Sequence, residues 1–461
     1  MDSILTIKKV AIAMGGTLKN IADENSVITS VSTDTRTLCD GAVFVALKGE
    51  NSDGHNFIPV ASERGALCAV AESSAALPDG IPLILVENTS QALLDLAAAY
   101  RREMKTPIVA VTGSVGKTST RGMIASVLSQ KYKTLATEGN FNNEIGVPLT
   151  LFRLTREHEA AVIEMGMNHF GELSRITASA QPDTVVITNV GEAHIENLGS
   201  REGILKAKLE ILEGLPCDGT VILGGDNDML ASIRGTLDFE TLYFGIESDG
   251  CDIKAENIKT YSNGSEFTFK LGEQEHKVVI NVPGRHHIYN ALSAILVGMK
   301  FDIPIPDIIA GIGEFVPVGL RQASVALDKY TIIKDCYNAS PTSMKAGLEV
   351  LSLNNSGRKV ACLGDMLELG TITESAHFET GKLVPSYNVD CLITVGKQAN
   401  LIADGAISAG MDASKVFRFE NNESLKEKLY DILNEGDVIL FKASRGMKLE
   451  EIAEFMEKNS K

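Results

Sequence analysis

The residues best suited to chemistry lie between positions 112 and 119, around the segment Thr-Gly-Ser-Val-Gly-Lys-Thr. An apolar run at 108–111 precedes this segment and an amphipathic stretch follows it, which predicts a strand, a glycine-rich turn and a helix. In that geometry, backbone N–H groups and the helix N-terminus bind phosphate. Lys117 would reach the β and γ phosphates of a nucleotide, and Thr118 would offer its hydroxyl to Mg²⁺. The predicted loop residues are Thr112, Gly113, Ser114, Val115, Gly116, Lys117, Thr118 and Ser119.

The spacing of this loop departs from the strict Walker pattern. That pattern has a glycine five residues before Gly116, where this chain has Val111, so the match is to a shorter loop. A glycine-lysine-threonine turn also occurs in loops that bind nothing. The strand before the turn and the apolar face from Met123 to Leu128 after it favour the phosphate-binding interpretation.

Two further candidates follow predicted strands of the same unit. Glu164 ends the apolar run that begins at Ala160, and His194 comes just after the run at 184–190. The carboxyl ends of parallel strands meet at the ligand-binding edge of an open sheet. Both side chains could therefore coordinate a hard cation, glutamate more naturally than histidine. A single glutamate at a strand end is also often a helix cap or a surface group, and the sequence leaves that alternative open.

Lys208 lies in a helix that we predict over 201–212. At about 100° per residue it falls in the middle of the apolar stripe made by Ile204, Ile211 and Leu212. A lysine that points inward must meet an anion, lose its proton or be modified, because an unpaired buried ammonium is costly. Reaction with CO₂ would give a carbamate able to orient Mg²⁺. The side chain could equally extend its ammonium group back to water, so the pattern leaves both interpretations open.

The pattern of strands and helices around these residues predicts an α/β fold. We expect three domains, since a chain of 461 residues is too long to fold around one hydrophobic core. Short strands separated by polar turns predict a small N-terminal α/β domain at 1–105. Residues 106–314 alternate apolar strands and helices, as in a doubly wound, mostly parallel sheet, with a hairpin inserted between Cys251 and Val282. The alternation resumes over 315–461, which predicts a Rossmann-like C-terminal domain.

Composition argues against several other classes. Sixty acidic and 43 basic residues give a net charge of −17, which disfavours a general role on nucleic acid. Seven scattered cysteines without CxxC spacing argue against a disulfide framework or a zinc cluster. No segment reaches the roughly 18 uninterrupted apolar residues of a membrane span, and the first residues lack a secretory pattern. We expect a cytoplasmic protein, and nothing in the sequence demands more than a monomer.

An ordered set of segments across the whole chain resembles the Mur ligase family. Within that family, the segments near the C-terminus are similar to those of the members that add D-alanyl-D-alanine to a nucleotide-linked muramoyl tripeptide. Besides the phosphate loop, the segments are 34–36, 46–49, 53–55, 140–148, 164–168, 189–194, 207–208, 283–291, 321, 335–344, 363–370 and 442–445.

The resemblance implies a ligase that uses ATP and Mg²⁺. It aligns Lys208 with the position at which the family carries a carbamylated lysine, and it gives catalytic roles to Lys117, Glu164, His194 and Lys208. Thr118, Glu164 and His194 would bind the metal. His287 stands where the family usually has asparagine. Further implied contacts to ATP are His287, Asn290, Arg321, Asp335 and Asn338.

The resemblance also implies that the N-terminal domain holds the uridine diphosphate end of the substrate. The implied partners are small molecules only, namely UDP-N-acetylmuramoyl-tripeptide, D-alanyl-D-alanine and ATP. ATP would phosphorylate the terminal carboxylate of the tripeptide, and the amine of the dipeptide would then displace phosphate, in peptidoglycan precursor synthesis. The implied contacts to the nucleotide substrate are Thr35, Arg36, Lys48, Gly49, Asp53, Gly54, His55, Asn142 and Asn143.

Alternatives remain at this level. The chain lacks the Asp-Asn-Pro-Arg motif of the sibling that adds a diamino residue, but another ligase of the same fold, such as a folate polyglutamate-adding enzyme, is the nearest competitor. A P-loop nucleotide switch that makes no bond is a competitor of a different class. No motif marks whether the third residue of the tripeptide is lysine or diaminopimelate.

Overall fold

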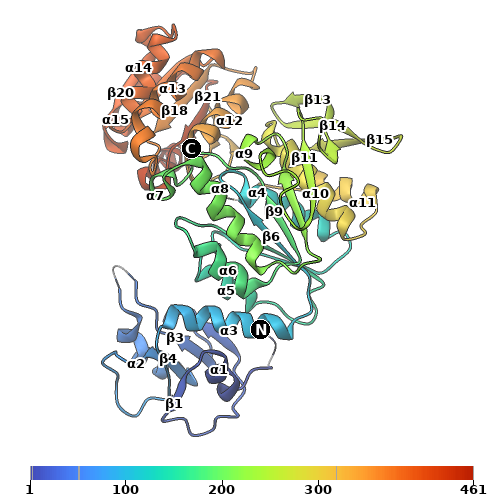
Figure 1. Cartoon of the computed structure of the whole chain (residues 1–461). Helices are drawn as coiled ribbons and strands as arrows, with labels where there is room; N and C mark the ends of the chain where they lie inside the picture. Colours follow the sequence, from blue (N-terminus) through green and yellow to red (C-terminus); the bar gives the residue numbers. More distant parts are fainter. Residues whose placement is uncertain (1, 3, 50–51, 318, 460–461) are drawn as a thin grey trace.

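The computed structural model describes residues 2, 4–49, 52–317 and 319–459. Its strands form sheets of five, seven, three and six members. In Figure 1 the N-terminal part, in blue, lies at one end of the molecule, the green and yellow part in the middle, and the orange and red part at the other end. The predicted α/β class is confirmed. Among the described helices, none is long and apolar enough to cross a membrane.

The N-terminal sheet has the order β1-β5-β4-β3-β2, and only the β1–β5 pair is antiparallel. Its last helix, α3, joins it to the central part, because Tyr100 donates a hydrogen bond to the Leu154 carbonyl at 2.6 Å. The elements are α1 (Ile7–Ala13), β1 (Thr17–Lys19), β2 (Ser30–Ser32), β3 (Ala42–Val45), α2 (Ile58–Glu63), β4 (Cys68–Glu72), β5 (Leu83–Val86) and α3 (Thr89–Glu103).

The central sheet is parallel throughout, with the order β12-β11-β10-β9-β6-β8-β7. The chain builds β7 and β8 on one side of β6 and then crosses over to build β9 to β12 on the other. The neighbours β6 and β9 therefore mark the switch point, where a crevice opens at the carboxyl ends. The strands are β6 (Ile108–Thr112), β7 (Thr134–Ala136), β8 (Ala160–Glu164), β9 (Thr184–Ile187), β10 (Thr220–Gly224), β11 (Glu240–Gly245) and β12 (Ile253–Lys254).

Both faces of this sheet are covered, which explains its continuous apolar strands. Ile108 and Ala110 pack into one core, while Val109 and Val111 pack into a second core with residues of α4 and α10. The central helices are α4 (Lys117–Leu128), α5 (Gly146–Leu151), α6 (Glu172–Ala180), α7 (Ile195–Leu198), α8 (Arg201–Leu209), α9 (Asp228–Ala231), α10 (His286–Lys300) and α11 (Ile305–Gly313).

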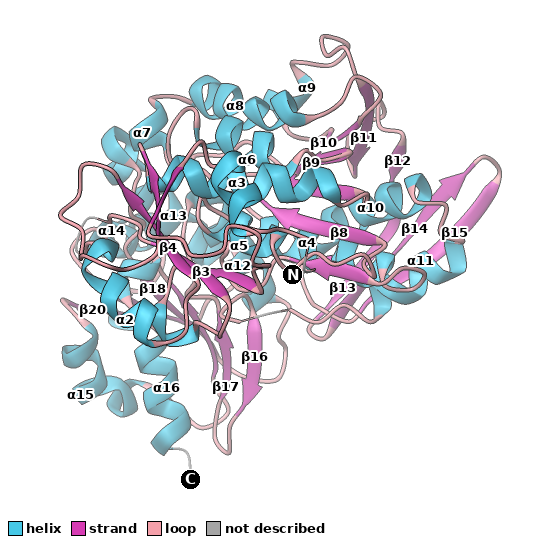
Figure 2. Ribbon diagram, turned by 90° about the horizontal axis from the view of Figure 1, so that it is seen from below, coloured by secondary structure: helices cyan, strands magenta, loops and turns pink. Residues whose placement is uncertain are grey.

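Two local predictions differ from the structure. The predicted hairpin is a three-stranded antiparallel sheet of β13 (Glu256–Tyr261), β14 (Gly264–Leu271) and β15 (Gln274–Ile280), seen beside α11 in Figure 2. The predicted helix over 201–212 ends as an α-helix at Leu209 and continues as a 3₁₀ turn, Glu210–Gly214. Close packing against α6 tightens that turn, because the Thr177 hydroxyl binds the Ile211 carbonyl at 2.8 Å.

The C-terminal sheet has the order β16-β17-β21-β18-β19-β20, with β16 antiparallel to β17 and the other pairs parallel. Helix α12 begins with a capping box at Ser340, and its N-terminus faces the central part (Figure 1). The elements are β16 (Ala323–Ala326), β17 (Thr331–Lys334), α12 (Pro341–Ser352), β18 (Lys359–Gly364), α13 (Thr373–Ser386), β19 (Cys391–Val395), α14 (Ala399–Ser408), β20 (Val416–Phe419), α15 (Asn422–Ile432), β21 (Val438–Lys442) and α16 (Glu450–Asn459).

A close contact between α11 and α4 supports the helix that follows the phosphate loop. A β-carbon at Gly311 would lie 2.7 Å from Val127 Cα, whereas one at Gly313 would meet nothing closer than 3.8 Å. We predict that Gly311→Ala lowers the free energy of unfolding by about 1–3 kcal/mol, because the helices must separate. Gly313→Ala, on the same helix, should change it by less than about 1 kcal/mol. Equal stability of the two variants in urea unfolding would contradict the predicted contact.

Candidate functional site

The predicted phosphate loop lies at the switch point and is shaped by two glycines. Gly116 has a φ of 88° and directly precedes α4, a conformation that favours glycine. A β-carbon on Gly113 would overlap the Thr188 side chain after β9. Because α4 begins at Lys117, its first N–H groups have no partner within the helix and are available to an anion.

Asn189 fastens this loop to the neighbouring segment, and the sequence had not marked it as a site residue. Its backbone carbonyl accepts from Ser114 N at 3.0 Å, and its side-chain oxygen accepts from Val115 N at 3.0 Å. Its side-chain amide donates to the Val115 carbonyl at 2.8 Å. The loop is therefore held in its phosphate-binding shape by a residue that follows the next strand of the sheet.

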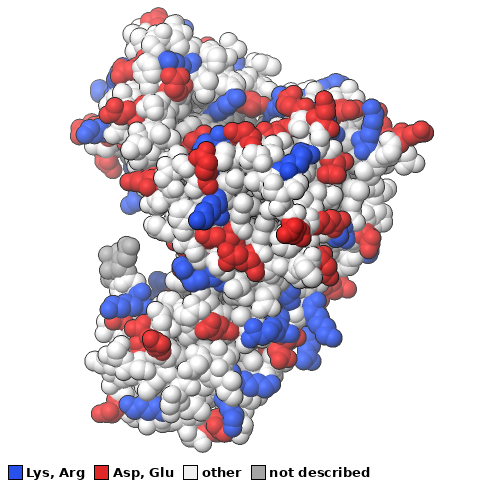
Figure 3. Space-filling model, viewed as in Figure 1, with Lys and Arg blue, Asp and Glu red and all other residues white. Residues whose placement is uncertain are grey.

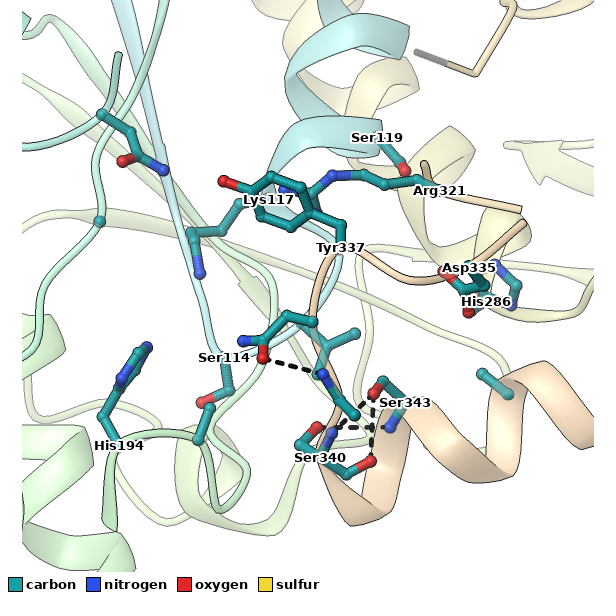
Figure 4. Close-up of a pocket in the computed structure, with 18 of the residues that line it drawn as sticks. Ser114, Lys117, Ser119, His194, His286, Arg321, Asp335, Tyr337, Ser340 and Ser343 are labelled. Atoms are coloured by element: carbon teal, nitrogen blue, oxygen red, sulfur yellow. Dashed lines mark hydrogen bonds between the residues drawn. The ribbon is translucent and has the colours of Figure 1, made fainter. Parts of the chain in front are cut away.

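A cavity of about 280 Å³ lies between this loop and the C-terminal part of the chain. Figure 4 shows side chains from both parts converging on it, with Lys117 and His194 from the central part and Arg321, Tyr337 and Ser340 from the other. Of the predicted site residues, the cavity is lined by Ser114, Val115, Gly116, Lys117, Ser119, Asn142, Asn143, His194, His287, Arg321, Asp335 and Asn338.

Lys117 is the cation at the centre of this cavity. Its ammonium group donates to the Gly113 carbonyl at 2.8 Å. Burial lowers the pKa of Lys117 to about 8, although the nearby Glu164 carboxylate opposes that shift. The ammonium is therefore only partly balanced within the chain, and a phosphate would supply the missing negative charge.

Glu164 and Thr118 lie behind the cavity and are buried. Asn142 donates to Glu164 Oε1 at 2.8 Å, while Arg121 Nε is 3.9 Å from Oε2. Neither Glu164 Oε2 nor the Thr118 hydroxyl has a hydrogen-bond partner among the described residues. A buried carboxylate oxygen and a buried hydroxyl without partners are costly unless a ligand satisfies them, and oxygen donors of this kind fit a hard divalent cation.

Lys208 points inward and is only 2% exposed, which favours the inward interpretation over the one in which its ammonium extends back to water. The described residues offer it no hydrogen bond or ion pair. Burial, with a smaller contribution from the charge of Lys117, holds the pKa of Lys208 well below its usual range. This shift favours the neutral amine, which is the form that reacts with CO₂.

His194 occupies the first position after the loop that follows β9, with a φ of 66°. Its ring lines the cavity, and its Nδ1 lies 2.7 Å from Glu368 Oε2 of the C-terminal part. The ring nitrogen makes no hydrogen bond to this carboxylate, so the contact is a close approach of the two groups. His194 is the third residue predicted to bind the metal, after Thr118 and Glu164, whose oxygen atoms are the donors that a hard cation prefers.

A second cavity, of about 820 Å³, adjoins the first and shares Val115, Gly116 and His286 with it. Asn290 lines it, and its side-chain oxygen accepts from the Thr120 hydroxyl of α4 at 2.9 Å. Tyr289 also lines it and donates to Asp226 at 2.9 Å. The larger and less polar of the two cavities is thus next to the phosphate loop and suits a base and its ribose.

His287 stands on the other side of Asn290. The two side chains are in contact, with Asn290 Nδ2 3.3 Å from His287 Nδ1, and the His287 ring lies against that of His286 with centroids 4.2 Å apart. Burial lowers the pKa of His287 well below its usual range, so the ring is neutral. The residue that departs from the family pattern therefore orients Asn290 and lines the smaller cavity.

The C-terminal part contributes positive charge to the cavity. The guanidinium group of Arg321 lies 4.1 Å from the centre of the Tyr337 ring, and Lys442 pairs with Asp335 at 2.7 Å. Lys442 also donates to the Asn338 carbonyl at 3.2 Å. Tyr337 and Lys442 line the cavity but were not among the predicted contacts. Both lie in segments that resemble the family, 335–344 and 442–445, so their positions within these segments could have identified them as site residues.

The predicted contacts of the N-terminal part do not reach either cavity. Arg36 is exposed and paired with Asp34 at 2.6 Å. His55 is buried, with Nδ1 2.6 Å from Asp53 and Nε2 accepting from the Glu72 N–H at 2.9 Å. Both nitrogens of His55 therefore hold the local turn together. The residues placed apart from the cavities are Thr35, Arg36, Lys48, Gly49, Asp53, Gly54 and His55.

A shorter-loop phosphate site at the switch point of a parallel sheet, faced by a second α/β unit, defines a nucleotide-dependent enzyme of the Mur ligase type. Residues 111–298 match the Mur ligase middle domain, 321–445 match the Mur ligase, glutamate ligase domain, and 27–103 match the Mur ligase family, catalytic domain. The chain belongs to the Mur ligase family and is an ATP-dependent ligase.

Relatives within this family are similar over almost the whole length. The chain is 41% identical to a Bacillus subtilis protein, with 97% of each covered, and 36% identical to an Escherichia coli protein, with 93% and 94% covered. Both relatives are named UDP-N-acetylmuramoyl-tripeptide--D-alanyl-D-alanine ligase. The resemblance on which the sequence analysis relied is therefore confirmed.

Solved structures of Mur ligases have the same fold as this chain. MurF from Acinetobacter baumannii superimposes with a TM-score of 0.90 at 30% identity, covering 98% of each chain. MurF from Thermotoga maritima, solved in complex with ADP, superimposes with a TM-score of 0.82 at 28% identity, covering 93% of this chain and 97% of that one. A Mycobacterium tuberculosis folylpolyglutamate synthase shares the fold, with a TM-score of 0.61 at 15% identity.

The pKa of Lys117 predicts how nucleotide affinity depends on pH. Phosphate beside the ammonium stabilises its charged form and raises the pKa above the value of about 8 in the free chain. ADP binding should therefore take up a proton near pH 8, and affinity should fall by up to about tenfold per pH unit above that. Calorimetric titration in two buffers of different ionisation enthalpy measures both quantities. Lys117→Arg, which stays charged, should show no such fall in affinity near pH 8. If the affinity of the wild-type enzyme for ADP did not change with pH over this range, Lys117 would not be the group that binds the phosphate.

Proposed function

We propose that this enzyme joins the terminal carboxylate of UDP-N-acetylmuramoyl-tripeptide to the amine of D-alanyl-D-alanine, with conversion of ATP to ADP and phosphate. The observation that carries the proposal is the cavity in which Lys117 and His194 face Arg321 and Asn338. The full-length relatives named for this reaction give the substrates. The product is the pentapeptide precursor of peptidoglycan.

The chemistry needs a carboxylate made reactive in water. Phosphorylation by ATP gives an acyl phosphate, and attack by the amine then releases phosphate. Transfer of this kind depends on positioning and on neutralising phosphate charge more than on covalent help from the protein. Lys117 and the first turn of α4 supply positive charge at the phosphates, and the adjoining cavity at Asn290 takes the adenosine end.

Thr118, Glu164 and His194 would hold Mg²⁺, and carbamylated Lys208 would stabilise their arrangement. The bound ion would neutralise phosphate oxygens during transfer. The support is the unpartnered hydroxyl and carboxylate oxygen and the neutral, buried amine. A carbamate would also place a negative charge beside Lys117, which burial otherwise leaves poorly balanced.

The N-terminal part, taken as residues 1–105, would hold the uridine diphosphate end of the substrate, with 106–314 as the ATP-binding domain and 315–461 as the Rossmann-like domain. A groove separates the N-terminal part from the rest on the face shown in Figure 3. Thr35, Arg36 and the turn at 53–55 would reach the cavity region only through movement of that domain or through a long substrate. We propose a monomer that works in the cytoplasm, where ATP and its nucleotide-linked substrate are made.

Phosphate release tests the function directly. We predict ATP-dependent release that requires both the muramoyl tripeptide and D-alanyl-D-alanine, with the pentapeptide detected by mass spectrometry. Lysine- and diaminopimelate-containing tripeptides, compared in the same assay, would identify the third residue. Release that is indifferent to both substrates would instead indicate a nucleotide switch, and glutamate addition to a folate would indicate the other ligase class.

Lys208 gives a second test, with Lys206 as its matched control because that lysine is exposed on the same helix. With ¹³C-labelled CO₂, we expect a carbamate carbon signal in wild type and in Lys206→Ala that is absent from Lys208→Ala. Removal of CO₂ should lower wild-type activity, and bicarbonate should restore it. Lys208→Ala should lose about 10²-fold or more in kcat. An unmodified Lys208 in the active, nucleotide-bound enzyme would sink the carbamate proposal.

A further inference from the structure

The segment that carries His194 meets the C-terminal part of the chain at Glu368, in the loop after β18. The carboxylate of Glu368 lies 2.7 Å from His194 Nδ1. That ring nitrogen is fully covered by protein, so Nε2 is the nitrogen left for a ligand. The His194 side chain is only 15% exposed, whereas that of Glu368 is 53% exposed, so the carboxylate extends from the C-terminal part to reach the ring.

Both residues have strained backbones. His194 has a φ of 66° and Glu368 a φ of 62°, in the left-handed region that side chains other than glycine rarely adopt. Each such residue is strained and persists only where the surrounding structure fixes it. Two such residues facing one another across a junction indicate that the contact itself has a function.

The contact exists only with the two parts of the chain seated against each other. Beside it, Glu196 N donates to the Glu368 carbonyl at 3.4 Å, and the Thr342 hydroxyl donates to Glu192 at 3.2 Å. A β-carbon on Gly370 would lie 3.2 Å from Glu196 Cα, so the loop approaches α7 closely. Separation of the two parts would remove Glu368 from His194.

We propose that Glu368 is a positioning residue that couples seating of the C-terminal domain to formation of the metal site. Through its 2.7 Å contact with Nδ1, the carboxylate fixes the ring and leaves Nε2 for a ligand. A metal-binding histidine needs such a partner on its other nitrogen to fix its tautomer and orientation. The metal donor set therefore becomes complete only when the C-terminal domain, which also carries Arg321 and Asn338, is in place. The inference rests on the proposed role of His194 in metal binding.

The charge state of Glu368 agrees with this role. The neighbouring imidazole lowers the pKa of Glu368 below its usual value, so it is a carboxylate at neutral pH. No other carboxylate among the described residues is paired with His194. Glu192, in the same loop as His194, instead accepts a hydrogen bond from the Thr342 hydroxyl.

Metal affinity tests the proposal without depending on turnover. Mn²⁺ binding to the ADP complex of the full-length enzyme, followed by electron paramagnetic resonance, should weaken about 10–100-fold in Glu368→Ala. Glu368→Gln, which keeps an acceptor oxygen but loses the charge, should fall between that variant and wild type. Glu374→Ala removes an exposed carboxylate near the start of α13 and should bind Mn²⁺ like wild type.

Two further variants separate the possible results. Thr342→Val removes a different hydrogen bond of the junction. Wild-type Mn²⁺ affinity in Thr342→Val, together with weaker Mn²⁺ affinity in Glu368→Ala, would assign the weakening to the contact with His194. Equal loss in both would reduce Glu368 to a structural contact and overturn the proposal. His194→Ala should lose at least as much affinity as Glu368→Ala. Wild-type affinity in either variant also overturns it, while dipeptide-dependent phosphate release in wild type would leave the proposed function standing.

Discussion

Lys208 and Glu164 are buried, and Lys117 is half-buried beside them where β6 and β8 of the central sheet end, so the chain alone does not balance their charges. Burial lowers the pKa of both lysines, the charge of Lys117 lowers the pKa of Lys208 further, and the Glu164 carboxylate opposes the shift at Lys117. A low-dielectric interior makes such an imbalance costly. The site therefore suits ligands that bring negative charge, which phosphate groups do, and it is consistent with the proposed carbamate on Lys208.

The sheet and its helices hold the backbone of the phosphate loop in place, and this positions the charged side chains of the site. The switch point brings the ends of β6 and β9 together, and Asn189 then holds Ser114 and Val115 in place. Thr120 of α4 fixes Asn290 of α10 in the same way. Rigid elements on both faces of a parallel sheet thus hold the phosphate and base cavities at one spacing. The glycines of the loop allow its backbone to approach Thr188 without a clash.

Other residues that line the cavity come from the C-terminal part of the chain. Arg321, Asn338 and Lys442 line the same cavity as the phosphate loop, and the Glu368 carboxylate contacts His194. A reactive acyl phosphate must be kept from water, so an enzyme of this class gains from completing its site only on closure. The exposed contacts of the N-terminal part, by comparison, are free to follow a long substrate.

The sequence alone determined a large part of this result. The apolar runs at 108–111, 160–164 and 184–190 predicted β6, β8 and β9 to within three residues, since a strand covered on both faces must be apolar throughout. The spacing around Lys117 gave the phosphate loop, and helical phase gave the inward direction of Lys208. The resemblance in ordered segments gave the family, because each motif stands at a position where backbone geometry or charge tolerates few residue types.

Only the tertiary structure decided which of those residues meet. Helical phase left Lys208 free to bury its amine or extend it to water, and burial against the rest of the central domain chose the first. Asn189, Tyr337, Lys442 and Glu368 lie in recognisable segments, but their roles depend on neighbours that are distant along the chain. His55 likewise combines a local contact to Asp53 with a hydrogen bond from the Glu72 N–H at the end of β4. Spacing fixes the face on which a side chain lies, whereas charge balance and hydrogen-bond partners exist only once distant segments pack together.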